Sequence, residues 1–303
     1  MKSSYKNREI PSYELSKALR EAAPAVRRER SEKHTESRWK SRLKTPKMTL
    51  LFLLAILFFI AEWFQPPLLG FMHVLLAVIP SLAVDLIISI KQERKKINLE
   101  SAFITGLIMA MVLSSSTAWY VTPVLSAIAA LSKHVLVNGR KPIFNPAATG
   151  LFIGLLVFSK GESWWGGLAL SPVPFLAVLV AAGYYLTNKI NKFPIVFSFL
   201  GSHFLVFLVF SIMGRGAPEV YSTPFIQSAL FFGFFMATDP PTSPGKTRDQ
   251  IVFGVLIGII SALMYVLFKG LSYLLVGLLT ANLWKYALDK MRAKKKQSSK
   301  RGV

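Results

Sequence analysis

Residues 68–90 read LLGFMHVLLAVIPSLAVDLIISI, a run of 23 residues in which Asp85 is the only charged side chain. A helix needs about 20 consecutive apolar residues to cross the hydrocarbon core of a bilayer, so this stretch predicts a transmembrane helix. Nine further apolar runs flank it. Their approximate bounds are 48–64, 101–118, 119–136, 146–159, 171–187, 195–213, 224–237, 251–268 and 271–288. We therefore expect an all-α integral membrane protein with about ten transmembrane helices.

Charge and apolar content are separated along the chain. Hydrophobic residues make up 52% of it, yet the formal net charge is +21. Residues 1–47, with 14 Lys/Arg against 6 Asp/Glu, are interpreted as a basic cytoplasmic N-terminal arm. Residues 48–288 form the ten-helix membrane domain, and residues 289–303 a basic cytoplasmic tail. Both basic ends are expected to meet anionic lipid headgroups. Nothing besides charge favours nucleic acid, so we expect no nucleic-acid partner.

Lys and Arg residues are distributed unequally between alternate loops. Connections after even-numbered runs hold eleven of them, whereas connections after odd-numbered runs hold three, Lys160, Arg215 and Lys269. By the positive-inside rule, the eleven and both termini lie in the cytoplasm of a bacterial inner membrane. Ten spans form two sets of five, and an odd-numbered set that is repeated once must be inverted in the membrane. We therefore expect a 5+5 inverted repeat, N-in and C-in.

The fifth and eighth runs are shorter than a full crossing, which is typical of helices that line a buried site. Residues 139–150, GRKPIFNPAATG, enter the fifth run. Asn145 is a favourable N-cap, and Pro146 suits the first helical turn. The small residues around Thr149 leave room for a neighbouring helix or for a flat ligand. A capped helix start that packs on its neighbour is the alternative to a ligand site.

Residues 236–246, MATDPPTSPGK, leave the eighth run. Asp239 stands at the edge of an apolar run, before two prolines that end the helix. Together with Thr238 it places hydrogen-bonding groups on the predicted cytoplasmic face, which is also the face of Asn145. An Asx-type turn that closes the helix is the alternative interpretation of this segment.

Two polar side chains lie inside predicted spans. Asp85 belongs to the second run, and an intramembrane carboxylate is costly unless it has a partner or a function. His203 lies deeper, in the seventh run. We expect these two residues to mark an ion or proton pathway. The alternatives are an interfacial position for Asp85 and a helix-to-helix hydrogen bond for His203.

Three motifs occur in a fixed order along the membrane domain. They are SAFITGL at residues 101–107, FNPA at 144–147 and MATDP at 236–240. Together these motifs resemble the RnfD/NqrB family, the membrane subunits of the Rnf and sodium-pumping NADH:quinone oxidoreductase complexes. The resemblance covers roughly residues 48–288.

The resemblance implies a flavin-bearing electron-transfer subunit. In the family, an FMN is attached to a Thr of a Ser-Gly-Ala-Thr type motif in the outer loop after the fifth span. The corresponding loop here, residues 159–168, contains no Thr, so covalent FMN is not expected. The family also binds flavin non-covalently near the cytoplasmic helix ends, which implies riboflavin or FMN in this chain. The residues that would meet it are Asn145, Pro146, Thr149, Thr105, Gly106, Thr238 and Asp239.

The chain contains no cysteine, so it cannot by itself ligate an iron–sulfur cluster. Its four His residues lack metal-ligand spacing, and no metal site is predicted. We find no catalytic residue, because the sequence has no nucleophile–base pair, P-loop or dinucleotide fingerprint. The resemblance then implies at most a subunit of an oxidoreductase or electron-transport complex. It would move electrons across the membrane, coupled to ion transport, with other membrane or extracytoplasmic redox subunits as partners.

A second class of function stays open, because the FMN attachment loop departs from the family pattern. A transporter, a channel or a scaffold subunit could use the same fold without a redox cofactor, since fold likeness does not fix function. Trp164 and Trp165 lie in this same loop, and we interpret them as anchors at the membrane–water interface.

Overall fold

The computed structural model describes residues 45–301 except 65, 67, 94–98, 115, 140, 159–161, 170 and 271. The predicted arm of residues 1–47 lies outside the described residues up to position 44. The chain divides into two units, residues 1–48 and 49–303. The second unit contains nearly all of the predicted membrane domain, and the helices and sites described below belong to it.

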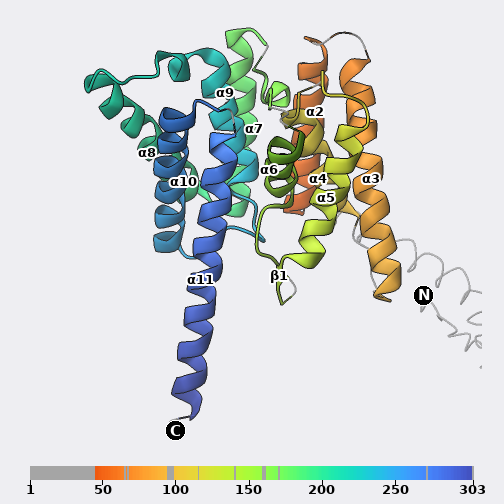
Figure 1. Ribbon diagram of the computed structural model, residues 1–303, viewed down its shortest axis with the longest axis vertical. Coiled ribbons are helices and arrows are strands. Elements are labelled where there is room, and N and C mark those ends of the chain that lie inside the picture. The colour runs from red at the N-terminus through yellow and green to blue at the C-terminus, as the bar shows by residue number, and fades with distance from the viewer. Residues whose placement is uncertain are drawn as a thin grey trace, which may run out of the picture. The chain divides into compact units, whose positions relative to one another are not determined.

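The described part of the chain is helical almost throughout, which confirms the all-α prediction (Figure 1). Its α-helices are α2 (Pro46–Glu62), α3 (Leu69–Lys91), α4 (Glu100–Val112), α5 (Val121–Val135), α6 (Pro146–Phe158), α7 (Leu176–Ile190), α8 (Phe193–Ile212), α9 (Thr223–Phe231), α10 (Thr247–Phe268) and α11 (Tyr273–Arg301). Short 3-10 turns are η1 (Trp165–Gly167), η2 (Val173–Phe175) and η3 (Pro218–Tyr221), and η4 (Phe232–Met236) is a π-helical continuation of α9. Strands β1 (Val137–Asn138) and β2 (Lys141–Pro142) pair antiparallel.

The helices differ in length in a way that matters for a membrane protein. Within the described residues, four segments are long and apolar enough to cross a bilayer: Leu69–Lys91, Val173–Ile190, Phe193–Ile212 and Thr247–Phe268. By contrast, α6 has 13 residues. At about 1.5 Å per residue such a helix is roughly 20 Å long, short of the roughly 30 Å hydrocarbon core. The predicted shortness of the fifth run is thus confirmed.

The third run is also shorter than predicted. We expected a helix over 101–118, but α4 ends at Val112. Leu113 adopts an extended conformation with ψ 144° and forms an isolated antiparallel bridge with Glu162. The backbone of the chain after α4 is therefore held by the connection between α6 and α7, and the helix does not continue there.

Two helix contacts of the first five-helix set recur in the second: the second helix packs on the fourth, and the fourth on the fifth. In the first set α3 packs on α4 and α5, and α5 packs on α6; in the second, α8 packs on α10, and α10 on α11. Close approach depends on glycine at two points. A Cβ at Gly106 would lie 2.7 Å from the Cα of Val78, and one at Gly258 would lie 2.7 Å from the carbonyl oxygen of Phe199. The inverted relation of the two sets stays a prediction.

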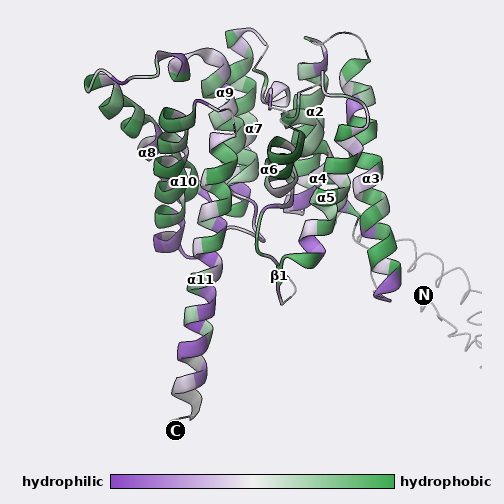
Figure 2. Ribbon diagram, in the orientation of Figure 1, coloured by the Kyte–Doolittle hydropathy of each residue, from purple (hydrophilic) through white to green (hydrophobic). Residues whose placement is uncertain are grey.

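Hydrogen bonds define two ends of the bundle. At one end, Lys192 Nζ donates to the carbonyl of Pro244, and the Asn145 side chain donates to the carbonyl of Met236. We call this the lysine-rich end; it includes the α5–α6, α7–α8 and α9–α10 connections. At the other, the Glu162 end, Ser272 donates to Glu162. In Figure 2 the helices are largely hydrophobic, while the distal part of α11 is hydrophilic. Which end faces the cytoplasm stays a prediction.

Candidate functional site

Asn145 occupies the start of α6 and connects three elements at the lysine-rich end. Its Oδ1 accepts from the N–H of Ala148 at 3.1 Å, as an N-cap does, so the predicted cap is confirmed. Its Nδ2 donates to the carbonyl of Met236 at 3.3 Å. Its own backbone N–H donates to Oδ1 of Asn282 in α11 at 2.9 Å. One buried side chain thus ties α6 to the end of η4, and its backbone ties α6 to α11.

The segment after η4 forms a compact polar turn. Thr242 Oγ1 donates to Oδ2 of Asp239 at 2.8 Å, and Ser243 Oγ donates to the Asp239 carbonyl at 2.7 Å. Thr238 Oγ1 donates back to the carbonyl of Phe234 at 2.5 Å. Asn282 Nδ2 donates to the carbonyl of Thr242 at 3.1 Å. The turn therefore closes the helix, as one of our two interpretations expected, and Asn282 holds both loops at once.

Lys192 is a basic group close to this turn. It lies between α7 and α8, is buried, and donates to the carbonyl of Pro244. Burial lowers the pKa of Lys192 to about 8; the charge of Asp239 acts to raise it, and the charge of Lys285 acts to lower it further. The lysine-rich end thus contains a buried cation that is influenced by both a carboxylate and a second lysine.

The predicted flavin contacts can be tested against these bonds. Asn145 uses its N–H, Oδ1 and Nδ2 within the protein, and Asn282 uses both ends of its amide. Thr149 Oγ1 donates to the carbonyl of Asn145 at 2.9 Å, and Thr238 is likewise engaged. An isoalloxazine ring would need unpaired donors or acceptors, and these side chains are already paired. The side chains of this cluster are engaged within the protein, and their role as flavin contacts stays a prediction.

The remaining predicted flavin residues lie on a different helix. Thr105 Oγ1 donates to the carbonyl of Ser101 within α4, at 2.9 Å. The backbone of α3 at Val78 occupies the space that a side chain at position 106 would need. The structure thus brings Asn145, Pro146 and Thr149 together with the Thr238–Asp239 turn, and gives Gly106 a packing environment against α3.

Asp85 has two basic partners that sequence reasoning did not identify. Its Oδ1 lies 2.9 Å from Lys133 Nζ and 2.6 Å from His134 Nε2, and all three side chains are buried. Both partners come from the last turn of α5, next to α3. A buried carboxylate that is paired in this way is satisfied electrostatically. Its role in an ion pathway stays a prediction.

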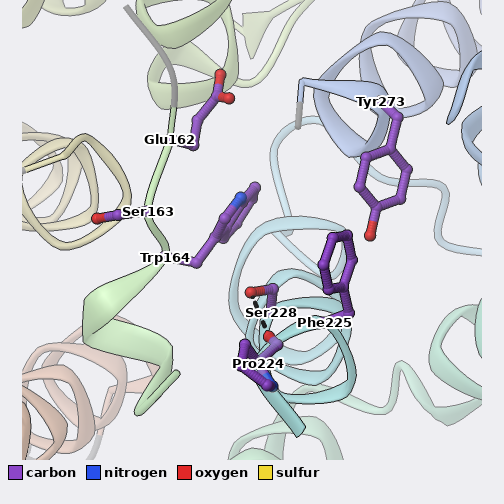
Figure 3. Close-up of a pocket in the computed structure, with 7 residues that line it drawn as sticks. All are labelled: Glu162, Ser163, Trp164, Pro224, Phe225, Ser228 and Tyr273. Atoms are coloured by element: carbon purple, nitrogen blue, oxygen red, sulfur yellow. Dashed lines mark hydrogen bonds between the residues drawn. The ribbon is translucent and has the colours of Figure 1, made fainter. Parts of the chain in front are cut away.

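The Glu162 end contains a cavity of about 200 Å³ (Figure 3). Its walls come from the α6–α7 connection, from α9 and from the start of α11, and consist of Glu162, Ser163, Trp164, Pro224, Phe225, Ser228 and Tyr273. Most of this lining is aromatic or apolar. Figure 3 places Trp164 between the Glu162 backbone and the α9 residues, with the Tyr273 ring on the opposite side.

Glu162 is the ionisable group that sequence reasoning passed over. Only 3% of its surface is exposed. Oε2 accepts from Ser272 Oγ at 3.2 Å, whereas Oε1 has no hydrogen-bond partner among the described residues. Burial raises the pKa of Glu162 to about 7, while hydrogen bonds from its own backbone and from Ser272 act to lower it. A signal was present in the sequence, since the fifth run is too short to carry its connection clear of the bilayer.

The two tryptophans of this connection are core residues. We expected Trp164 and Trp165 to be interfacial anchors, and this is wrong: both are almost fully buried. Trp165 Nε1 donates to the carbonyl of Ala110 in α4 at 2.8 Å, and Trp164 packs edge-on against Phe232. The indoles fill the space beside the short α4, so they build the inner wall of the Glu162 end.

His203 contacts Tyr273, one of the residues that line the cavity. Its ring stacks on Tyr273 with centroids 5.7 Å apart and planes 9° apart. The side chain is fully buried in α8, and Nδ1 has no hydrogen-bond partner among the described residues. The structure therefore places His203 beside the Glu162 cavity, while Asp85 pairs with the end of α5.

The chain matches the family described as the NQR2, RnfD, RnfE family, over residues 33–169 and 163–298. The two matches meet in the connection between α6 and α7, which is also where the two five-helix sets meet. Together they cover nearly all of the described helices.

Three curated proteins illustrate the similarity. A Na(+)-translocating NADH-quinone reductase subunit of Chromohalobacter salexigens is 21% identical over 236 residues, covering 63% of this chain and 57% of that protein. The subunit of the same name in Ectopseudomonas mendocina is 23% identical over 237 residues, covering 63% and 59%. An ion-translocating oxidoreductase complex subunit of Aeromonas hydrophila is 30% identical over 115 residues, covering 37% and 32%. The matched region spans less than two thirds of the length of each relative.

Proposed function

Because the chain belongs to the NQR2, RnfD, RnfE family, we propose that it is a membrane subunit of an ion-translocating redox complex. The relatives are named as subunits of a Na(+)-translocating NADH-quinone reductase and of an ion-translocating oxidoreductase complex. The observation that carries the proposal is that the family match runs through both five-helix sets. In this role the chain works in the bacterial inner membrane with other redox subunits, its lysine-rich end and both termini in the cytoplasm.

The structure supports different roles for the two ends of this subunit. At the lysine-rich end, Asn145 and Asn282 bond the loops of the two five-helix sets to each other. This network positions the ends of α6 and η4 and engages both ends of each amide side chain. At the Glu162 end, a buried carboxylate borders a cavity. The first arrangement is suited to holding the helices, and the second to handling an ion.

A non-covalent riboflavin or FMN is the cofactor part of the proposal, and it rests on the family resemblance. When bound, it would supply one- and two-electron redox chemistry within the membrane domain. The polar groups of the Asn145 cluster are engaged, so we route no electron-transfer step through them. Without cysteine the chain holds no iron–sulfur relay of its own, so a partner must bridge any long gap in the electron path.

Purification in mild detergent through a tag on the full chain tests the proposal. We expect redox subunits to co-purify, with a flavin absorbance spectrum and a free flavin mass after denaturation. Ion uptake by reconstituted vesicles should then depend on a reductant such as NADH. A colourless protein that purifies alone and conducts ions without any reductant would contradict the redox role and favour the transporter or channel alternative. A complex that forms and works without flavin in this chain would favour a scaffold.

A further inference from the structure

The Glu162 carboxylate is buried, and the described part of the chain offers it no paired cation. Among the residues that the structure describes, no basic side chain forms an ion pair with Glu162; Lys269, in the neighbouring α10–α11 connection, pairs with Glu219 at 3.5 Å instead. A single side-chain hydrogen bond, from Ser272 to Oε2, stabilises the ionised form. An unpaired buried carboxylate is costly as an anion, so this environment favours the neutral acid.

The cavity beside Glu162 suits a proton better than a metal cation. Hard cations such as Ca²⁺ take about 6–8 oxygen ligands, and even small ions need several. The lining offers side-chain oxygens from Glu162, Ser163, Ser228 and Tyr273. Of these, Oε1 of Glu162 and Oγ of Ser163 are buried without a partner in the described chain. The rest of the wall is formed largely by Trp164, Phe225 and Tyr273. A carboxylic acid needs no further ligands to become neutral.

The inner side of the cavity leads to a second group that can exchange protons. Tyr273 lines the cavity and stacks on His203, whose Nδ1 is without a partner among the described residues. Next to the cavity residue Ser228, the amide of Gln227 is fully buried, and neither of its ends has a partner in the described chain. Buried polar groups of this kind are the usual partners of internal water.

The structure assigns Glu162 as a reversible proton-binding residue of this subunit, loaded from the cavity at the Glu162 end of the helices. Oε1 accepts a proton from a hydronium ion that reaches the cavity, so the carboxylate becomes a neutral carboxylic acid and the hydronium ion becomes water. The reverse step returns the proton to water and re-forms the carboxylate. No electron or further reactant is involved. The assignment rests on the proposed function for the use of the proton, and it names the ion that this site handles.

Other titratable groups around Glu162 are few. Tyr273 comes from α11, and the described part of α9 contributes none to the cavity. From the first five-helix set, Glu62 lies beside Gly70 and Trp165, and His73 shares the carbonyl of Ala110 with Trp165. Lys269 and Glu219 pair with each other at the surface. Both carboxylate oxygens of Glu62 are buried without a partner in the described chain, so a carboxyl titration near neutral pH requires variants that separate Glu162 from Glu62.

Infrared difference spectroscopy of the full chain, in detergent and without partners or reductant, tests the assignment. We expect a protonated-carboxyl C=O band that disappears with a midpoint near pH 7. The band should be absent in Glu162→Gln and unchanged in Glu219→Gln, a carboxylate at the same end that is exposed and paired with Lys269. A band that persists unchanged in Glu162→Gln and is lost in Glu62→Gln, or a midpoint below pH 5, would overturn the assignment. Because no complex is needed, loss of the redox role would leave this result intact.

Two further arms keep the test decisive. If Glu162→Gln does not fold, Ser272→Ala replaces it: losing the one side-chain donor to Oε2 should raise the midpoint, and an unchanged midpoint would count against Glu162. Titrations in NaCl and in choline chloride of equal ionic strength should give the same midpoint. A midpoint that falls by about one unit for each tenfold rise in sodium would replace the proton with Na⁺ as the bound ion.

Discussion

The two ends of the bundle differ in how their central polar side chains are bonded. At the lysine-rich end, Asn145 and Asn282 engage both ends of their side-chain amides in hydrogen bonds that hold the loops. At the Glu162 end, Glu162, Ser163 and Gln227 each keep a buried polar atom without a partner in the described chain, beside a cavity of about 200 Å³. Both ends contain short helices, so helix length alone does not decide which arrangement forms.

The difference shows how one fold separates stability from ion chemistry. Each buried polar group that lacks a partner costs about 1–3 kcal/mol, and such costs are retained mainly where they serve a function. At the lysine-rich end, Asn145 and Asn282 avoid this cost by mutual bonding, which also fixes the two five-helix sets to each other. At the same end, Thr187 Oγ1 and Gln250 Oε1 lack partners in the described chain. At the Glu162 end this cost remains, and one of the groups that bear it, Glu162, can change its charge near neutral pH.

Asn282→Leu should have the largest effect. It removes the acceptor for the Asn145 N–H and the donor to the Thr242 carbonyl, so two buried backbone groups lose their partners. We expect a loss of about 3 kcal/mol in the free energy of unfolding, measured in mixed detergent micelles. Gln227→Leu at the other end removes a buried amide that has no described partner, and should be neutral within about 0.5 kcal/mol. Equal losses of unfolding free energy in the two variants would contradict the proposed difference between the two ends.

Asn145→Ala should cost about 1–2 kcal/mol, since it removes the N-cap of α6 and the bond to Met236. Asn145→Ser is the matched variant. It keeps a capping oxygen for the Ala148 N–H and lacks the amide donor to Met236, so it should recover roughly half of the lost stability. Thermal unfolding of the three proteins in the same detergent gives the ranking. If the two variants are equally unstable, the cap is not the stabilising element.

The pH dependence of unfolding should separate the two ends. The pKa of Glu162 is raised to about 7 in the folded chain, from 4.5 in the unfolded one. Between these values the folded protein binds more protons, so its stability should fall as pH rises from 4.5 to 7 and level off above. By linkage, a full shift from 4.5 to about 7 corresponds to a change of about 3 kcal/mol. Glu162→Gln should abolish the slope, and Glu219→Gln should leave it in place.

Lys192→Met should have the smallest effect, about 0.5 kcal/mol at neutral pH, because the lost hydrogen bond to Pro244 is offset by removal of a buried charge. Since the pKa of Lys192 is lowered to about 8, the unfolded chain binds more protons above that pH. Wild-type stability should therefore rise as pH increases from 8 toward 10.5, the ordinary value for lysine. The methionine variant should lack this rise, and an unchanged profile would show that another group titrates there.

Much of the architecture followed from patterns in the sequence. The apolar runs predicted the order of the helices, and shared predicted membrane faces brought the Asn145 and Asp239 loops together. Those inferences worked because hydrophobic length and capping are local properties. The premature end of α4 was not local: Leu113 is held by Glu162, far along the chain, and its own neighbours would permit another turn.

The polar partners could not be inferred from the sequence. Asn282 lies inside an apolar run without any motif, and only the fold brings it to Asn145. Likewise, Asp85 finds Lys133 and His134 on a neighbouring helix, at a separation that no periodicity encodes. The sequence places Glu162 in an outer loop, and loops usually run over the protein surface. Its burial follows from the short helices around it, which leave the connection among their side chains.

Helix α11 runs without a break from the cavity to the cytoplasmic tail that we predict, and it carries Tyr273 and Asn282 on one rod. The two residues are nine positions apart, a rise of about 14 Å along the axis. An axial shift or rotation of α11 therefore moves Tyr273 in the cavity wall and Asn282 at its hydrogen bond with Asn145 together. A partner that binds the distal end of α11 would therefore act on the cavity and on the Asn145 hydrogen bonds at once, without contacting either site.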